Sequence, residues 1–198
     1  MDSSVTARRL DSVLLVQLRS PDDYPRLTRA VLRTLSDLFR AMARRDDVCG
    51  IVLTGSETAF AAGADLEEVA ALDAVEATRF APLGQGVMRQ IENLRKPVVA
   101  AIRGYCLGGG FDLAMACHLR YATPDAVFGH PGGALGLITG WGGTARLPRI
   151  VGRSRALELL TSGRTISAQE AFEWKLVNRV VEPTRLLEAA CAAARGCM

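Results

Sequence analysis

Residues 97–112 constrain the fold of this chain more than any other segment, because they join an apolar run to a glycine turn. Residues 97–104 (PVVAAIRG) are almost continuously apolar, which is typical of a strand buried on both faces. Three consecutive glycines follow at 108–110, and residues 111–115 then show helical spacing. A strand, a glycine turn and a helix in this order expose backbone N–H groups that have no partner within the helix.

The rest of the chain alternates strand and helix patterns over 198 residues, of which 49% are hydrophobic. We expect strands at residues 12–18, 47–55, 119–122, 126–128 and 177–181. We expect helices at residues 27–42, 65–69 and 74–94, and further helices that begin near residues 142, 154, 167 and 183. Because there is no internal repeat and no low-complexity linker, the pattern predicts one α/β domain.

Charge and hydropathy bear on the class of partner. The 24 basic and 21 acidic residues are mixed along the chain, and the net charge of +3 indicates neither a nucleic-acid arm nor a membrane patch. The first residues lack the basic run and apolar core of a signal peptide, and the longest apolar stretches are too short to span a bilayer. We therefore expect a cytoplasmic protein that binds neither nucleic acid nor membrane.

Cysteine and histidine usage predicts no disulfide framework and no metal site. The cysteines are odd in number and form no CxxC pair, so we expect reduced thiols at Cys49, Cys106, Cys117, Cys191 and Cys197. The two histidines, His118 and His130, lie in no metal-binding spacing such as HExxH. His118 is expected to be structural.

Two segments combine small residues with an expected helix start, at residues 60–66 (FAAGADL) and 104–112 (GYCLGGGFD). The first N–H groups of a helix carry a partial positive charge, so two converging helix starts can bind an oxyanion. Small side chains are needed there because a ligand oxygen must approach the backbone closely.

These two segments resemble motifs of the crotonase (enoyl-CoA hydratase/isomerase) superfamily, and so do three others. The others are residues 96–102 (KPVVAAI), 140–149 (GWGGTARLPR) and 167–171 (SAQEA). The resemblance runs from about residue 14 to residue 181 in the family order. It implies a spiral of ββα units that binds an acyl-CoA thioester, with no cofactor because coenzyme A is part of the substrate. It also implies a homo-oligomer, either a trimer or a dimer of trimers.

The resemblance assigns the oxyanion-binding N–H groups to Ala64 and Gly109. It places backbone near Ala62 at the adenine end of coenzyme A, and Asp65 and Leu66 at the border of the site. Gly108, beside the oxyanion hole, is included among the substrate-binding residues.

Hydratases of this superfamily use two glutamates, and the matching positions here are Asp112 and Gly132. Asp112 is shorter than glutamate by one C–C bond, about 1.5 Å, and is the expected acid–base residue. The helix dipole favours the carboxylate form of Asp112, whereas burial favours the neutral acid. The alternative to a catalytic role is that Asp112 only caps or stabilises the start of the helix. Since Gly132 carries no carboxyl group, His130 is the nearest titratable candidate for a second group.

Two further residues are assigned to substrate binding. Arg26 lies where family members often approach the phosphates of coenzyme A, although an ordinary surface arginine explains it equally well. Trp141 lies in the glycine-rich loop, where it packs or shapes the acyl pocket.

Three functions follow from this pattern. The leading hypothesis is a hydratase that adds water to a 2-enoyl-CoA, with Asp112 as the acid–base residue. The alternatives are a double-bond isomerase, which needs only one base, and a non-catalytic acyl-CoA-binding member. We expect a crotonase-like core at residues 1–182 and, at 183–198, the start of a truncated C-terminal helical module, so that the family trimer is in question.

Overall fold

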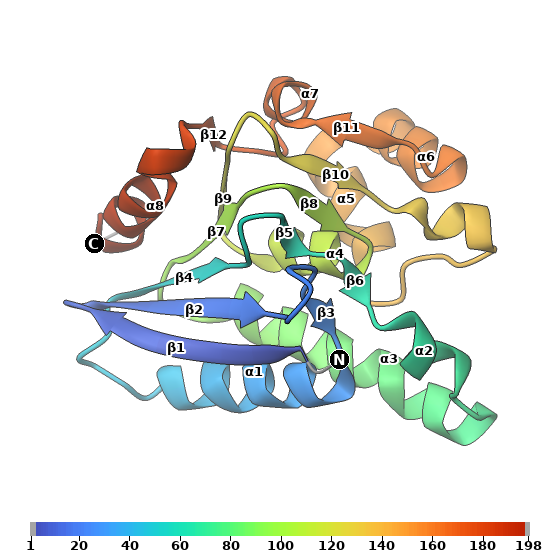
Figure 1. The fold of residues 1–198 in the computed structure, drawn as a ribbon, viewed down its shortest axis with the longest axis horizontal. Coiled ribbons are helices and arrows are strands. Elements are labelled where there is room, and N and C mark those ends of the chain that lie inside the picture. Colours follow the sequence, from blue (N-terminus) through green and yellow to red (C-terminus); the bar gives the residue numbers. More distant parts are fainter. Residues whose placement is uncertain (1–2, 197–198) are drawn as a thin grey trace.

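A six-stranded sheet forms the centre of the computed structural model, which describes residues 3–196 (Figure 1). In spatial order its strands are β1 (Ser4–Leu10), β2 (Val13–Arg19), β4 (Gly50–Thr54), β7 (Val98–Ile102), β9 (Leu119–Ala122) and β12 (Arg179–Val180). The β1–β2 hairpin is antiparallel and the other pairs are parallel. The apolar run after Pro97 thus becomes β7, a strand interior to the sheet.

Shorter strands form a second layer. A four-stranded sheet has the order β11 (Thr165–Ser167), β10 (Val127–Gly129), β8 (Tyr105–Leu107) and β5 (Ala59–Ala61), and β3 (Arg26–Leu27) pairs with β6 (Gly63–Ala64). The strand pairs β4/β5, β7/β8 and β9/β10 each send one strand to either sheet before a helix follows. This repetition confirms the predicted spiral of ββα units.

The helices join these layers and cover their faces. They are α1 (Arg29–Met42), α2 (Leu66–Ala70), α3 (Ala74–Glu92), α4 (Gly109–Ala116), α5 (Gly143–Val151), α6 (Arg153–Ser162), α7 (Ala168–Glu173) and α8 (Leu186–Arg195), with 3₁₀ turns at Pro131–Leu135 and Pro183–Arg185. Within residues 3–196, no helix combines the length and the apolar character that crossing a membrane requires.

Both faces of the interior strands β4 and β7 are buried, and alternate residues of these strands belong to different cores. In β4, Ile51 and Leu53 join the main core on the side of α1 and α3, whereas Val52 joins a second core with α8. In β7, Val99 and Ala101 also face α8. Parallel strands covered on both faces carry such continuous apolar runs.

Most expected elements are present, with informative differences. The helix expected at 27–42 begins at Arg29, because the Thr28 side chain accepts the Val31 N–H and caps it. The strand β1 was not predicted, since most of its side chains are exposed and show no apolar alternation. Cys197 lies outside the described residues, and the boundary at residue 182 stays a prediction.

Candidate active site

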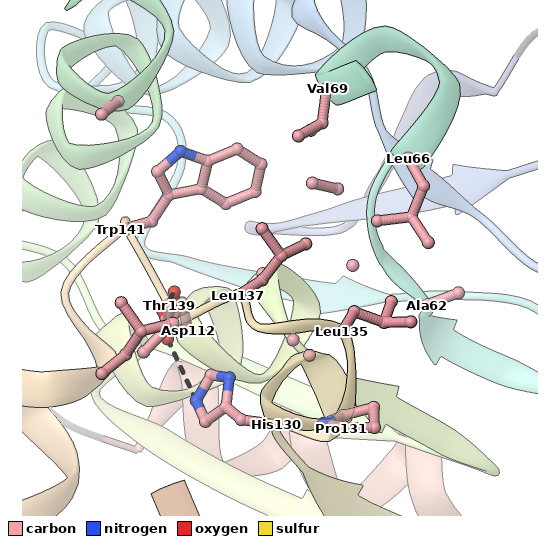
Figure 2. A pocket seen from close by; sticks show the side chains of 18 of the residues that line it. Ala62, Leu66, Val69, Asp112, His130, Pro131, Leu135, Leu137, Thr139 and Trp141 are labelled. Atoms are coloured by element: carbon pink, nitrogen blue, oxygen red, sulfur yellow. Dashed lines mark hydrogen bonds and ion pairs between the residues drawn. The ribbon is translucent and has the colours of Figure 1, made fainter. Parts of the chain in front are cut away.

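A largely apolar cavity of about 330 Å³ lies where β6, α3, α4 and the loop at residues 130–141 meet (Figure 2). Its volume is within the range of small-molecule sites. Its lining includes the small residues of both predicted segments and larger apolar side chains from three elements. These lining residues are Ala62, Gly63, Ala64, Leu66, Val69, Phe80, Ala81, Gly108, Gly109, Asp112, His130, Pro131, Gly132, Leu135, Leu137, Ile138, Thr139, Gly140 and Trp141.

The N-terminus of α4 opens onto this cavity. The helix begins at Gly109, and its cap residue Gly108 has φ +52° and provides no side-chain hydrogen bond. The Asp112 N–H donates to the Gly108 carbonyl at 3.0 Å, which is the first turn of the helix. By helix geometry, the N–H of Gly109 precedes that bond and has no partner within the helix.

Ala64 lies beside Gly109, although it does not belong to a helix start. A Cβ added at Gly109 would lie 3.4 Å from the Ala64 nitrogen, and one added at Gly63 would lie 3.3 Å from the Gly109 nitrogen. Both segments lead into a helix as predicted, because α2 begins at Leu66 and α4 at Gly109. Ala64 itself, however, belongs to strand β6. The backbone of Ala64 and Gly109 is nevertheless brought together.

Trp141 forms one wall of the cavity and is itself 4% exposed. A Cβ added at Gly84 of α3 would lie 2.4 Å from the five-membered ring of its indole, and one at Gly109 would lie 2.3 Å from the six-membered ring. Phe80 meets it edge to face at 5.4 Å between ring centroids. The indole is thus fitted between two glycines on different helices.

Asp112 projects from the first turn of α4 and is only 1% exposed. Its Oδ2 accepts a hydrogen bond from the Thr139 hydroxyl. Burial raises the pKa of Asp112 to about 6, although the Thr139 hydroxyl and Arg146 act in the opposite direction. Burial therefore outweighs the hydrogen bonds and the charge that oppose it, and the capping alternative is wrong because Gly108 occupies the cap position of α4.

His130 lies against the other oxygen of Asp112. Its Nε2 is 3.4 Å from Asp112 Oδ1, and both atoms are buried without a hydrogen-bond partner among the described residues (Figure 2). Burial lowers the pKa of His130 to about 4. The ring also packs against Phe111 at 5.0 Å between centroids. His118 is elsewhere, where its Nδ1 accepts the Val98 N–H at 3.0 Å.

Gly132 lines the cavity at the position that matches the second glutamate of hydratases. Among the described lining residues, Asp112 is the one that carries a carboxyl group. The loop that follows places apolar side chains along the opening instead, with Leu135 63% and Ile138 72% exposed.

The remaining predicted residues lie around the opening. Leu66 lines the cavity and is half exposed, and the Ala62 N–H donates to the Pro25 carbonyl at 2.8 Å. Asp65 caps α2 by accepting the N–H groups of residues 67 and 68, and is not among the lining residues. Arg26 is also outside the lining and forms an ion pair with Asp22 at 2.8 Å.

Several lining residues were not predicted. The most important is Thr139, whose hydroxyl holds the Asp112 carboxyl group from 27 residues away. Val69 and Leu137, which are labelled in Figure 2, form part of the apolar wall of the cavity. Phe80 forms another part of it, beside Trp141. The only signal for the loop residues was an apolar run, LGLIT at 135–139, inside a glycine-rich segment.

A spiral of ββα units in which a helix start faces an apolar cavity defines a crotonase-type protein. A model of the enoyl-CoA hydratase/isomerase family matches residues 8–198, so the chain belongs to this family. It is 37% identical to a short-chain-enoyl-CoA hydratase of Clostridium acetobutylicum, over 95% of this chain and 72% of that protein. It is 40% identical to a crotonyl-CoA hydratase of Syntrophomonas wolfei, over 93% of this chain and 71% of that protein. A solved enoyl-CoA hydratase of Bacillus anthracis superposes with a TM-score of 0.91 at 37% identity, covering 98% of this chain and 75% of that chain.

Proposed function

We propose that the chain is an enoyl-CoA hydratase, a lyase that adds water reversibly to the double bond of a 2-enoyl-CoA. One observation carries the proposal beyond family membership: a single buried carboxyl group with a pKa of about 6 lies in the cavity at the start of α4. A general acid–base group works best when its pKa is close to the operating pH.

The N–H groups of Ala64 and Gly109 form the oxyanion hole in this proposal. Attack of water at Cβ moves an electron pair from the double bond through Cα onto the thioester oxygen, which becomes an enolate. Two backbone donors close together beside a helix N-terminus stabilise that charge. Their support here is the close approach of the two backbone segments, and the small side chains within these segments at Gly63, Ala64, Gly108 and Gly109.

Asp112 moves the proton in this scheme. Its carboxylate takes one proton from water as the water oxygen bonds to Cβ, and the resulting carboxylic acid returns a proton to Cα as the enolate collapses. The base is regenerated, and the product is the 3-hydroxyacyl thioester. Hydration is balanced by water alone, so we propose no cofactor beyond the coenzyme A portion of the substrate.

The apolar lining and the exposed rim supply the binding surface. We propose that Leu66, Leu135 and Ile138 contact the acyl-CoA at the opening, where their side chains are exposed beside the cavity. Ala62, Asp65, Gly108, Gly132, Trp141 and, for the phosphates, Arg26 remain predicted contacts. A homo-oligomer and a cytoplasmic location also stay predictions.

Hydration of crotonyl-CoA, followed by loss of the enoyl absorbance, tests the proposal. We expect turnover by the purified chain and a loss of about 10²–10⁴-fold in kcat for Asp112→Asn, which keeps the side-chain volume and removes the base. Asp125→Asn, which alters an exposed aspartate outside the cavity, is the matched control and should retain activity. No absorbance change at high enzyme concentration would overturn the proposal.

The presence of one carboxyl group also favours a second candidate, double-bond isomerisation, in which a single base carries a proton between two carbons. A 3-enoyl-CoA assay separates the two activities. If acyl-CoA binds by calorimetry and neither substrate is turned over, the chain is a non-catalytic binding member.

A further inference from the structure

Both oxygens of Asp112 face side chains of the segment 130–139. Oδ2 accepts the Thr139 hydroxyl, and Oδ1 lies 3.4 Å from His130 Nε2. Each atom of the second contact is buried and has no other hydrogen-bond partner among the described residues. A buried polar atom without a partner is costly, so a pair of such atoms facing each other suggests a bond that forms during function.

The space around this contact is kept open by a glycine. A Cβ added at Gly143, the first residue of α5, would lie 2.3 Å from Asp112 Oδ1 and 2.8 Å from His130 Nε2. Only a residue without a side chain allows the two groups to approach each other here. Figure 2 shows His130 and Asp112 directed toward each other at the base of the cavity.

We propose that His130 is a positioning residue for Asp112: its Nε2–H donates to Oδ1, while Oδ2, held by Thr139, exchanges the proton with water. This inference rests on the proposed hydratase function. Because Nε2 and Oδ1 are both shielded from solvent, their contact acts on the reaction through Asp112. A neutral imidazole donates from one nitrogen, and a carboxylate oxygen has two lone pairs, so Oδ2 accepts from Thr139 and from water together.

The pair replaces part of what the absent second carboxylate does in a hydratase. Two carboxylates share the water there, whereas here one carboxylate is held at both oxygens by the loop that carries Gly132. His130 Nε2 and Asp112 Oδ1 are 3.4 Å apart, and catalytic hydrogen bonds often shorten in the complex with substrate. A hydrogen bond donated by His130 to the carboxylate form lowers the pKa of Asp112, which counteracts the effect of burial and keeps Asp112 ionised near neutral pH.

The charged and titratable groups around the pair are few in the described chain. Arg146 of α5 lowers the pKa of Asp112, and its guanidinium is itself held by Glu92 at 2.7 Å. Burial keeps the pKa of the Cys106 thiol well above its usual range, and the negative charge of Asp112 acts in the same direction. Neither group provides a hydrogen-bond donor to Oδ1. The backbone N–H groups of Trp141 and Gly143 also lower the pKa of Asp112, but neither forms a hydrogen bond with Oδ1. The side chain facing Oδ1 is that of His130.

Three histidine variants test the proposal by a pH profile and by spectroscopy. His130→Leu removes the donor, His130→Gln places an amide N–H near the position of Nε2, and His118→Gln is a control at the other, exposed histidine. Carbon-13 spectra of the Asp112 carboxyl group in substrate-free protein report its titration directly. Nitrogen-15 spectra of His130 report which ring nitrogen carries the proton.

We expect His130→Leu to raise the pKa of Asp112 by about one unit. At pH values below the pKa of Asp112 in both proteins, the ionised fraction and kcat then fall about tenfold, and well above both pKa values they change little. KM should change little, His130→Gln should restore the profile, and His118→Gln should match the wild type. The His130 spectrum should show a protonated Nε2.

The opposite arrangement, in which a neutral Asp112 donates to a bare Nε2, predicts opposite signs. The pKa of Asp112 would then fall in His130→Leu, and the proton of His130 would lie on Nδ1. Either result overturns the proposal, as does a pH-independent loss of activity that glutamine fails to rescue. If the wild type hydrates no enoyl-CoA, the proposed function fails, while the spectra still decide whether the pair exists.

Discussion

Asp112 and His130 are buried side by side, and burial shifts their pKa values in opposite directions. The pKa of Asp112 rises to about 6, so between about pH 4 and 6 the folded state holds a proton that the unfolded state has lost. Its stabilisation is complete below pH 4 and is lost as the pH rises through 6. The pKa of His130 falls to about 4, so its stabilisation is present above about pH 6.5 and is lost as the pH falls toward 4. The two contributions oppose each other between these limits.

Removing one partner, and comparing the variant with the wild type, isolates the contribution of that partner to the pH dependence of stability. Asp112→Asn should gain stability relative to the wild type as the pH rises from 4 to 6, by about 1.4 kcal/mol per pH unit. The reason is that the variant has no buried carboxylate to ionise. Urea unfolding at several pH values measures this difference, and contributions from groups common to both proteins cancel.

His130→Gln provides the mirror-image control for this measurement. The free energy of unfolding of His130→Gln, relative to that of the wild type, should fall by about 1.4 kcal/mol per pH unit as the pH rises from about 4 to 6.5. Two slopes of the same sign would contradict the assigned pKa shifts.

At the scale of elements, the packing of α3 on α4 depends on the indole of Trp141. Gly84→Ala would place a methyl group 2.4 Å from that ring, and overpacking of this kind costs about 1–3 kcal/mol. Gly86→Ala, two residues along the same helix, meets nothing within 4 Å and should stabilise the protein by up to about 1 kcal/mol through helix propensity. Chemical denaturation of both variants measures the contrast.

The smaller side chain of Trp141→Leu should relieve the overpacking. In that background Gly84→Ala should behave like Gly86→Ala, so the double variant would show a coupling energy between the two sites. Equal effects of Gly84→Ala and Gly86→Ala in the wild-type background would show that the indole does not occupy the space between the helices.

The sequence predicted the elements that have periodicity and missed those that pairing alone creates. The run at 97–104 predicts β7, and the glycines that follow predict the start of α4 at Gly109. The strands β5, β6 and β8 span two or three residues each, which is too short for a pattern, and they exist because neighbouring strands supply their hydrogen bonds. The same limit explains why β6, which contains Ala64, was not predicted.

The candidate site divides in the same way. Asp112 and Gly109 could be predicted because they follow a motif at fixed spacing. The contacts of Asp112 with Thr139 and His130 join residues that are 27 and 18 positions away, through a loop whose path no local pattern specifies. Such contacts follow from the folded arrangement of α4 and the loop.

At the scale of the whole molecule, the fold has two cores on opposite faces of one sheet. The cavity belongs to the side of α3 and α4, whereas α8 packs on the other face with Val52, Val99 and Ala101. Figure 1 shows α8 at the far side of the sheet from α2 and β6. Stability and the active site can therefore be changed separately by substitutions in α8.

Two neighbouring leucines at the start of α8 test this separation. Leu186 is 4% exposed and belongs to the second core, whereas Leu187 is 38% exposed. Leu186→Ala should lower the free energy of unfolding by about 2–5 kcal/mol through the lost contacts and the cavity left behind, and Leu187→Ala by much less. Both variants should retain wild-type kcat and KM with crotonyl-CoA at temperatures where they remain folded. Equal stability losses would show that α8 does not pack on the sheet in this orientation, and a fall in kcat of the folded Leu186→Ala protein would show that the second core is coupled to the cavity.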